Sequence, residues 1–301
     1  MPCYRNSLIV LAATMLLIAS YQFPPQNPRK PAQESSDSQA VTTMSCGVDE
    51  KHAGTYSAAT SFRQVKLDRD VAELKSIIEQ ELRQPILCLV EPGLHDGPLH
   101  DFGLASSSQR DGNLYIVIDP DYLDRTEITH ELFHLKMRTE GVFVFGFDVK
   151  GPANVDPDLV FEAQGRFGNL IQHSLFFGRM RAMGIDPAAN QRKTMIQTMS
   201  GPMPWNPINS VEATYDYAQC VLLFNNPSFT KQYGDWLKSV GFGEEVGKGE
   251  QIAQSIAQSN PRTEEQMKDE LAKDLTIMFE EQFTHSMFTP RREILPHQDR
   301  K

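Results

Sequence analysis

The sequence contains few cysteines and few groups that would bind nucleic acid. Only four of its 301 residues are cysteine (Cys3, Cys46, Cys88 and Cys220), and no two form a C-x-x-C pair. A zinc site built from closely spaced thiolates is therefore not indicated. Lysine and arginine total 29 against 39 aspartates and glutamates, a formal net charge of −10, and no basic patch stands out. This balance argues against a nucleic-acid binder.

One apolar run stands at the N-terminus, where Ser7–Ser20 (SLIVLAATMLLIAS) follows a segment whose only charged side chain is Arg5. The run is shorter than the roughly 20 apolar residues of a membrane span and matches the core of a signal peptide, with Ala19 or Ser20 as the small residue at a cleavage site. We expect residues 1–23 to be a signal peptide, with an uncleaved membrane anchor as the alternative. Both interpretations export the rest of the chain, to the periplasm or outside the cell.

A polar stretch rich in proline, serine and glutamine follows at 24–48 and lacks apolar periodicity. Such a composition predicts a disordered linker. We therefore expect the folded domain to cover 49–301, with regular structure opening near residue 60.

The cysteines favour free thiols over cross-links. Cys88 lies in an apolar run (PILCLV) and Cys220 in an apolar helical pattern, while Cys46 belongs to the polar stretch. Cleavage would remove Cys3 and leave an odd number. We expect free buried cysteines, with one disulfide and one unpaired thiol as the alternative for an exported protein.

The remaining pattern predicts an α+β fold, with a small N-terminal sheet followed by helices. Apolar spacing indicates a helix from Asp68, and Asp124 with Glu127 has the form of a capping box at the start of the next one. A loop is expected at 91–112, and a helical subdomain would begin near residue 185. The expected strands are 85–90 and 113–119, and the expected helices are 68–82, 124–140, 156–184, 190–200, 209–224, 228–239, 247–258 and 263–282.

The second of these helices carries the run His130-Glu131-Leu132-Phe133-His134. Residues i and i+4 lie on the same face of a helix, so both imidazoles can reach one Zn²⁺ at about 2.0–2.1 Å. Glu131 is one position further round the helix, where it can take a proton from water that the zinc has acidified. This HExxH pattern predicts metal ligands at His130 and His134 and a general base at Glu131.

The run, the strand before it and the helix after it resemble the zincin metallopeptidases and, more loosely, their gluzincin branch. This resemblance implies a zincin-like fold, a Zn²⁺ cofactor, a peptide or protein substrate, and a glutamate ligand on the following helix. Some positions depart from the family pattern. Lys136 replaces a hydrophobic residue, HLKMRTEGVFV lacks the third histidine of metzincins, and Phe161 precedes Glu162 where gluzincins have asparagine.

A third ligand is expected on the 156–184 helix, because a catalytic zinc takes three protein ligands. Glu162, Asn169 and His173 are spaced by 7 and 11 residues and so share one face. The gluzincin resemblance favours Glu162, with His173 as the alternative. Asn169 and Tyr215 are candidates to support the ligands by hydrogen bonds or to stabilise an oxyanion.

These features predict a zinc-dependent hydrolase, specifically a metallopeptidase. The alternatives are a non-peptidase zinc amidase, a metal-sensing module, or an inactive interaction protein. Contact with a membrane is expected only through the N-terminal segment, if it stays uncleaved.

Overall fold

The computed structural model describes residues 42–48, 62–91, 105–110, 113–142, 147–201 and 208–290. Its contacts separate Met1–Ala40 from Val41–Lys301, and every described residue belongs to the second unit. The signal-peptide prediction for 1–23, and residues 24–41 of the predicted linker, lie outside the described residues.

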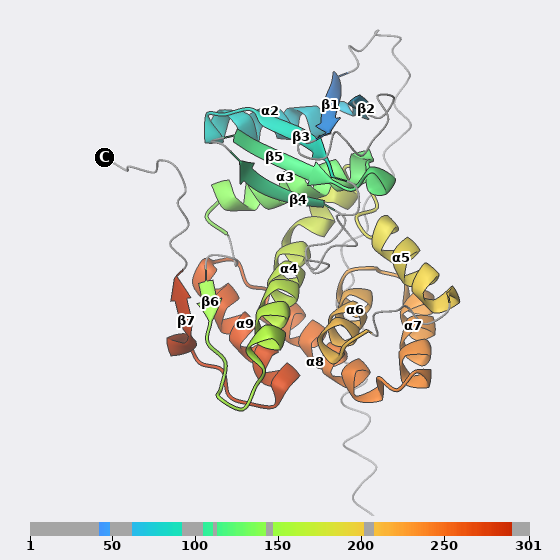
Figure 1. Cartoon of the computed structure of the whole chain (residues 1–301), viewed down its shortest axis with the longest axis vertical. Helices are drawn as coiled ribbons and strands as arrows, with labels where there is room; N and C mark the ends of the chain where they lie inside the picture. Colours follow the sequence, from blue (N-terminus) through green and yellow to red (C-terminus); the bar gives the residue numbers. More distant parts are fainter. Residues whose placement is uncertain are drawn as a thin grey trace, which may run out of the picture. The chain divides into compact units, whose positions relative to one another are not determined.

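A five-stranded sheet forms the N-terminal part of the second unit (Figure 1). Its inner strands are parallel neighbours, and each edge strand is antiparallel to the strand beside it. In spatial order the strands are β2 (Phe62–Leu67), β1 (Thr42–Val48), β3 (Ile86–Val90), β5 (Asn113–Ile118) and β4 (Ala105–Arg110).

Two of these strands correct the sequence prediction. The predicted linker is wrong for Thr42–Val48, which form β1, with Met44 and Cys46 buried and Thr43 and Ser45 exposed. This period-two alternation is short and carries polar residues on one face, so it resembles linker composition in the sequence. The predicted loop at 91–112 is likewise wrong for Ala105–Arg110, which form β4. The serine-rich sequence of this strand gives little strand signal.

Helices α2 (Arg69–Leu82) and α3 (Arg125–Thr139) contact each other, and both contact the sheet (Figure 1). The Asp124 side chain caps α3 by accepting hydrogen bonds from the backbone amides of Thr126 and Glu127. The Glu127 carboxylate accepts a hydrogen bond from Asn190 at 2.9 Å. The start of α3 is therefore set by its own cap and by the helix that carries Asn190.

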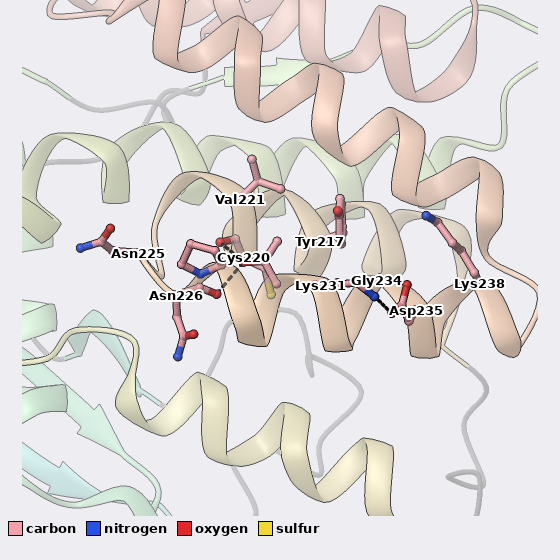
Figure 2. A pocket seen from close by; sticks show the side chains of 11 residues that line it. Tyr217, Cys220, Val221, Asn225, Asn226, Lys231, Gly234, Asp235 and Lys238 are labelled. Carbon is pink, nitrogen blue, oxygen red and sulfur yellow. Dashed lines mark hydrogen bonds and ion pairs between the residues drawn. The ribbon is translucent and has the colours of Figure 1, made fainter. Parts of the chain in front are cut away.

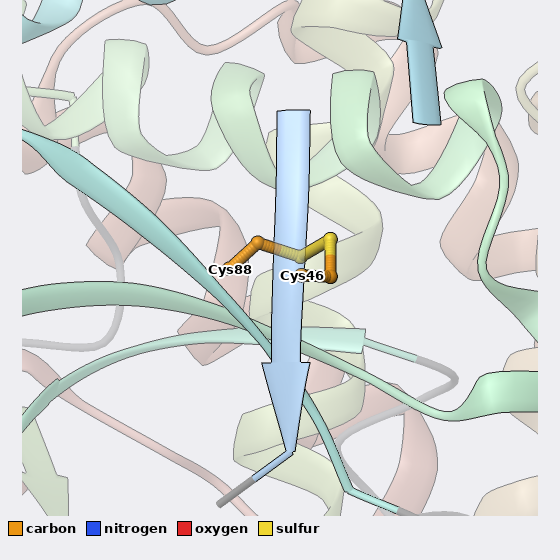
Figure 3. Close-up of a disulfide and its surroundings, with 2 residues drawn as sticks. All are labelled: Cys46 and Cys88. Atoms are coloured by element: carbon orange, nitrogen blue, oxygen red, sulfur yellow. A yellow bond between two sulfur atoms is a disulfide. The ribbon is translucent and has the colours of Figure 1, made fainter. Parts of the chain in front are cut away.

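A disulfide joins Cys46 of β1 to Cys88 of β3 (Figure 3). The two residues are direct partners in the parallel register, with their Cα atoms 4.5 Å apart. Cys220 is free and buried. Our preference for free cysteines is thus wrong for two of the three, because only the strand pairing brings these distant positions together.

The C-terminal half is mostly helical, as expected, and a two-stranded sheet of β6 (Phe147–Val149) and β7 (Phe288–Pro290) accompanies it. Gly249 of α8 (Gly243–Ser259) lies against the backbone of α6 (Ser210–Leu222). A Cβ at Gly249 would stand only 2.6 Å from the backbone oxygen of Thr214, so a side chain there would separate the two helices. The elements are β6 (Phe147–Val149), α4 (Pro157–Ala182), α5 (Ala189–Ser200), α6 (Ser210–Leu222), α7 (Pro227–Ser239), α8 (Gly243–Ser259), α9 (Glu264–Phe279) and β7 (Phe288–Pro290), with 3₁₀ turns at Pro120–Tyr122 and His285–Met287.

Helix α4 connects the two halves, because it contacts α3 on one side and α6, α8 and α9 on the other. The buried apolar side chains form one core that includes the sheet and the helices. Within the described residues, no separate subdomain begins near residue 185. None of the described helices is long and apolar enough to span a membrane.

Candidate metal centre

Helix α3 is buried along the whole stretch that contains the HExxH run. Every residue from Glu127 to Leu135 is buried, because the sheet lies against one side of α3 and α4 against another. His130 and His134 are only 6% and 9% exposed. A surface helix with two solvated histidines is thereby excluded.

Helix α4 brings a third histidine to this pair. The Nε2 atom of His134 lies 3.1 Å from Nε2 of His130 and 3.2 Å from Nε2 of His173. Two nitrogens held at about 2.0–2.1 Å by one tetrahedral zinc would stand about 3.3 Å apart. The three imidazoles therefore have the spacing of a metal ligand set, and they form the one such group of three among the described residues.

Glu162, the third ligand that the gluzincin resemblance favoured, lies outside this group. Its carboxylate accepts hydrogen bonds from Arg166 at 2.9 Å and from Asn209 at 2.7 Å. Both of its oxygens thus have protein partners. The placement corrects our ranking, and the alternative, His173, is the residue that the structure brings to His130 and His134.

The protonation of the three histidines suits a cation. Burial lowers the pKa of His134 to about 4, and burial first, with the neighbouring imidazoles second, lowers the pKa of His130 and His173 well below the ordinary value. Neutral imidazoles each keep one lone pair. Three lone pairs that face one another are satisfied together by a single metal ion.

Gln172 was not singled out in the sequence, yet it contacts the site directly. Its Oε1 lies 2.9 Å from Nδ1 of His134. The Nδ1 atoms of His130 and His173 have no hydrogen-bond partner among the described residues. The only signal in the sequence was a polar residue beside His173 in an apolar helix.

Aromatic rings pack against the imidazoles and hold their orientation. The Phe176 ring centroid lies 5.4 Å from that of His130, 5.0 Å from that of His134 and 5.4 Å from that of His173. Phe177 stacks on His173 with ring centroids 4.8 Å apart. Both phenylalanines are fully buried, so the three histidines have little freedom to move apart.

Two buried carboxyl groups lie on α3, in the same buried stretch as His130 and His134. Burial, and secondarily the charge of Glu127, raises the pKa of Glu131 to about 8. Burial likewise raises the pKa of Glu127 to about 7, against a lowering effect of its hydrogen bond from Asn190. A cation bound at the neighbouring histidines would favour the ionised form of Glu131, because opposite charges stabilise one another.

Asn169 and Tyr215, the residues predicted to support the ligands or stabilise an oxyanion, lie in different parts of the fold. Asn169 is half-buried, one turn of α4 before His173. Tyr215 of α6 is buried and lies under Arg166, whose guanidinium carbon is 5.5 Å from the centre of its ring. Tyr215 is therefore grouped with Arg166 and Glu162, whereas Asn169 precedes His173 by one turn of the same helix.

A separate pocket of about 390 Å³ lies between α6 and α7 (Figure 2). Tyr217, Cys220 and Val221 line it from α6, and Lys231 pairs with Asp235 on its α7 side. None of the three histidines lines it. Burial also raises the pKa of the Cys220 thiol, which disfavours its thiolate form.

No family model, curated protein or solved structure matches this chain.

Proposed function

We propose that this protein is a zinc-dependent hydrolase, specifically a metallopeptidase with a zincin-like arrangement. The observation that carries the proposal is the convergence of the Nε2 atoms of His130, His134 and His173, with Glu131 adjacent to the first of them on α3. The placement of the motif helix between a sheet and a second helix that supplies a ligand supports the resemblance.

The three histidines would hold the metal, and their chemistry favours zinc. Imidazole nitrogens suit Zn²⁺, and catalytic zinc sites use three protein ligands and leave one position open. Three neutral ligands leave the full +2 charge at the site. When bound, the ion supplies Lewis-acid chemistry, which polarises an amide carbonyl and acidifies water.

Glu131 is proposed as the general base. Its carboxyl group is buried, and this burial raises the pKa of Glu131 above the ordinary value of a glutamate. A base in such surroundings can accept a proton from water and return it to the leaving amine. The adjacent position on the helix keeps it beside the ligands without making it one of them.

An edge strand near α3 favours a peptide as substrate. Strand β4 ends the sheet among the described strands, and it contacts α3. The free N–H and C=O groups of an edge strand can pair with an extended peptide. Ser106 and Ser107 of this strand are half-buried and have small side chains, which would obstruct a peptide little.

The disulfide supports export of the chain. Disulfides form in secreted and periplasmic proteins and are rare in the cytosol. The Cys46–Cys88 bond thus agrees with the predicted signal peptide, and a peptidase in that location would act on exported proteins.

The proposal is tested by loading the purified protein with Zn²⁺ and measuring cleavage of a mixed library of quenched fluorescent peptides. We expect one zinc per chain and peptide cleavage that a chelator abolishes and added zinc restores. Zinc binding without peptide cleavage would instead indicate an amidase or a metal-sensing module. Absence of zinc binding would contradict the proposal altogether.

A further inference from the structure

The side chain of Gln172 occupies a buried position between α3 and α4. It is 0% exposed, and its Oε1 lies 2.9 Å from Nδ1 of His134. It directly precedes His173 in the chain, so adjacent residues of α4 meet the same histidine of α3.

The direction of this hydrogen bond fixes where the His134 proton lies. An amide oxygen can only accept, so His134 Nδ1–H donates to Gln172 Oε1 and leaves the lone pair on Nε2. That nitrogen is the one that faces His130 and His173. If the amide group were turned round, its N–H would donate to Nδ1 of His134. The ring proton would then be on Nε2, where it would block metal binding.

The other end of the amide argues against a purely structural role. The Nε2 atom of Gln172 is buried and has no hydrogen-bond partner among the described residues. An unpaired buried amide N–H destabilises a fold, and an apolar residue of similar size would avoid this cost. Gln172 makes one described hydrogen bond that an apolar residue could not make, the bond to His134.

We propose that Gln172 is a positioning residue, which holds His134 in the tautomer and orientation that bind the metal. This inference rests on the proposed metal site. In this arrangement α4 supplies both the third ligand, His173, and the hydrogen-bond acceptor for His134. The packing of α4 on α3 would therefore position two ligands at once.

Metal binding by three variants of the full-length protein tests this role, with Zn²⁺ and Co²⁺ alone as probes. Gln172→Leu removes the acceptor, whereas Gln172→Glu keeps one. Gln219→Leu is the matched control, because Gln219 is also buried (2% exposed) but lies on α6. We expect Gln172→Leu to weaken zinc binding about 10–100-fold and to change the visible spectrum of bound Co²⁺. Gln172→Glu and Gln219→Leu should bind like the wild type.

Two results would overturn the inference while the proposed site stands. One is wild-type affinity and an unchanged Co²⁺ spectrum in Gln172→Leu. The other is an equal loss in Gln172→Leu and Gln219→Leu, which would indicate a general effect of removing a buried amide. Failure of the wild-type protein to bind either metal would overturn the proposed function as well, so the two failures are distinguishable.

Discussion

His134 and His173 are 39 positions apart in the chain, yet their Nε2 atoms lie 3.2 Å apart in the fold. Both rings are buried, which lowers their pKa values, and Phe176 packs against both. Together with His130 they form a buried group of three imidazoles that could hold one metal ion.

The first prediction concerns the third ligand. His173→Ala should lose stoichiometric zinc, because it removes one of three converging nitrogens. Glu162→Gln should keep zinc, since its carboxylate is occupied by Arg166 and Asn209. Elemental analysis after dialysis measures both. His285→Ala, at a largely exposed histidine in the C-terminal 3₁₀ turn, is the control for removing an imidazole. Zinc retained in His173→Ala but lost in Glu162→Gln would restore the glutamate as ligand.

The second prediction concerns the general base. Glu131→Gln should retain zinc and lose peptide cleavage by about 10²–10⁴-fold, because the amide cannot accept the proton. Steady-state cleavage rates and zinc content of the same preparation measure this. Glu140→Gln is the matched control, at the exposed C-terminal end of the same helix. Loss of zinc from Glu131→Gln would make Glu131 a ligand and refute its role as base.

The third prediction concerns the pH dependence of stability. Burial, and secondarily Glu212, raises the pKa of Asp216 from its ordinary 3.8 to about 7. Between these values the folded protein holds a proton that the unfolded chain has lost, so this group makes the fold less stable as pH rises from 4 to 7. Its stabilising contribution is fully present below pH 4.

Asp216→Asn should remove that part of the slope and still accept the hydrogen bond that Tyr233 donates to Asp216 at 2.7 Å. At pH 8 we expect the variant to be more stable than the wild type by about 1–4 kcal/mol, with the difference shrinking toward pH 4. Urea unfolding at several pH values measures it. Parallel curves for the two proteins would disprove the assignment.

The fourth prediction concerns the disulfide. Cys46→Ala with Cys88→Ala should lower the free energy of unfolding by about 2–5 kcal/mol, because the bond ties β1 to β3 across a 42-residue separation. Denaturant unfolding under oxidising and reducing conditions measures this. The double variant should be insensitive to reductant, and Cys220→Ala should remain as sensitive as the wild type. Equal stability of oxidised and reduced wild type would count against the prediction.

The sequence by itself determined the local features of this protein. Caps and apolar spacing placed α2, α3 and α4 within a few residues, because helix ends and amphipathic faces depend on neighbours in the chain. The i, i+4 spacing put His130 and His134 on one face for the same reason. The α+β class followed from the order of the elements.

The tertiary structure decided what depends on distant contacts. Glu162 and His173 share a face of α4 but lie about 16 Å apart along the helix axis. Which of them can serve as the third metal ligand therefore depends on which turn of α4 packs against α3. Local spacing cannot give that contact. Phe176 packs against the histidines of both helices, and the same packing brings Gln172 to His134. Strand β1 and its disulfide likewise require a partner strand, because alternation in a short polar segment becomes specific only when it pairs.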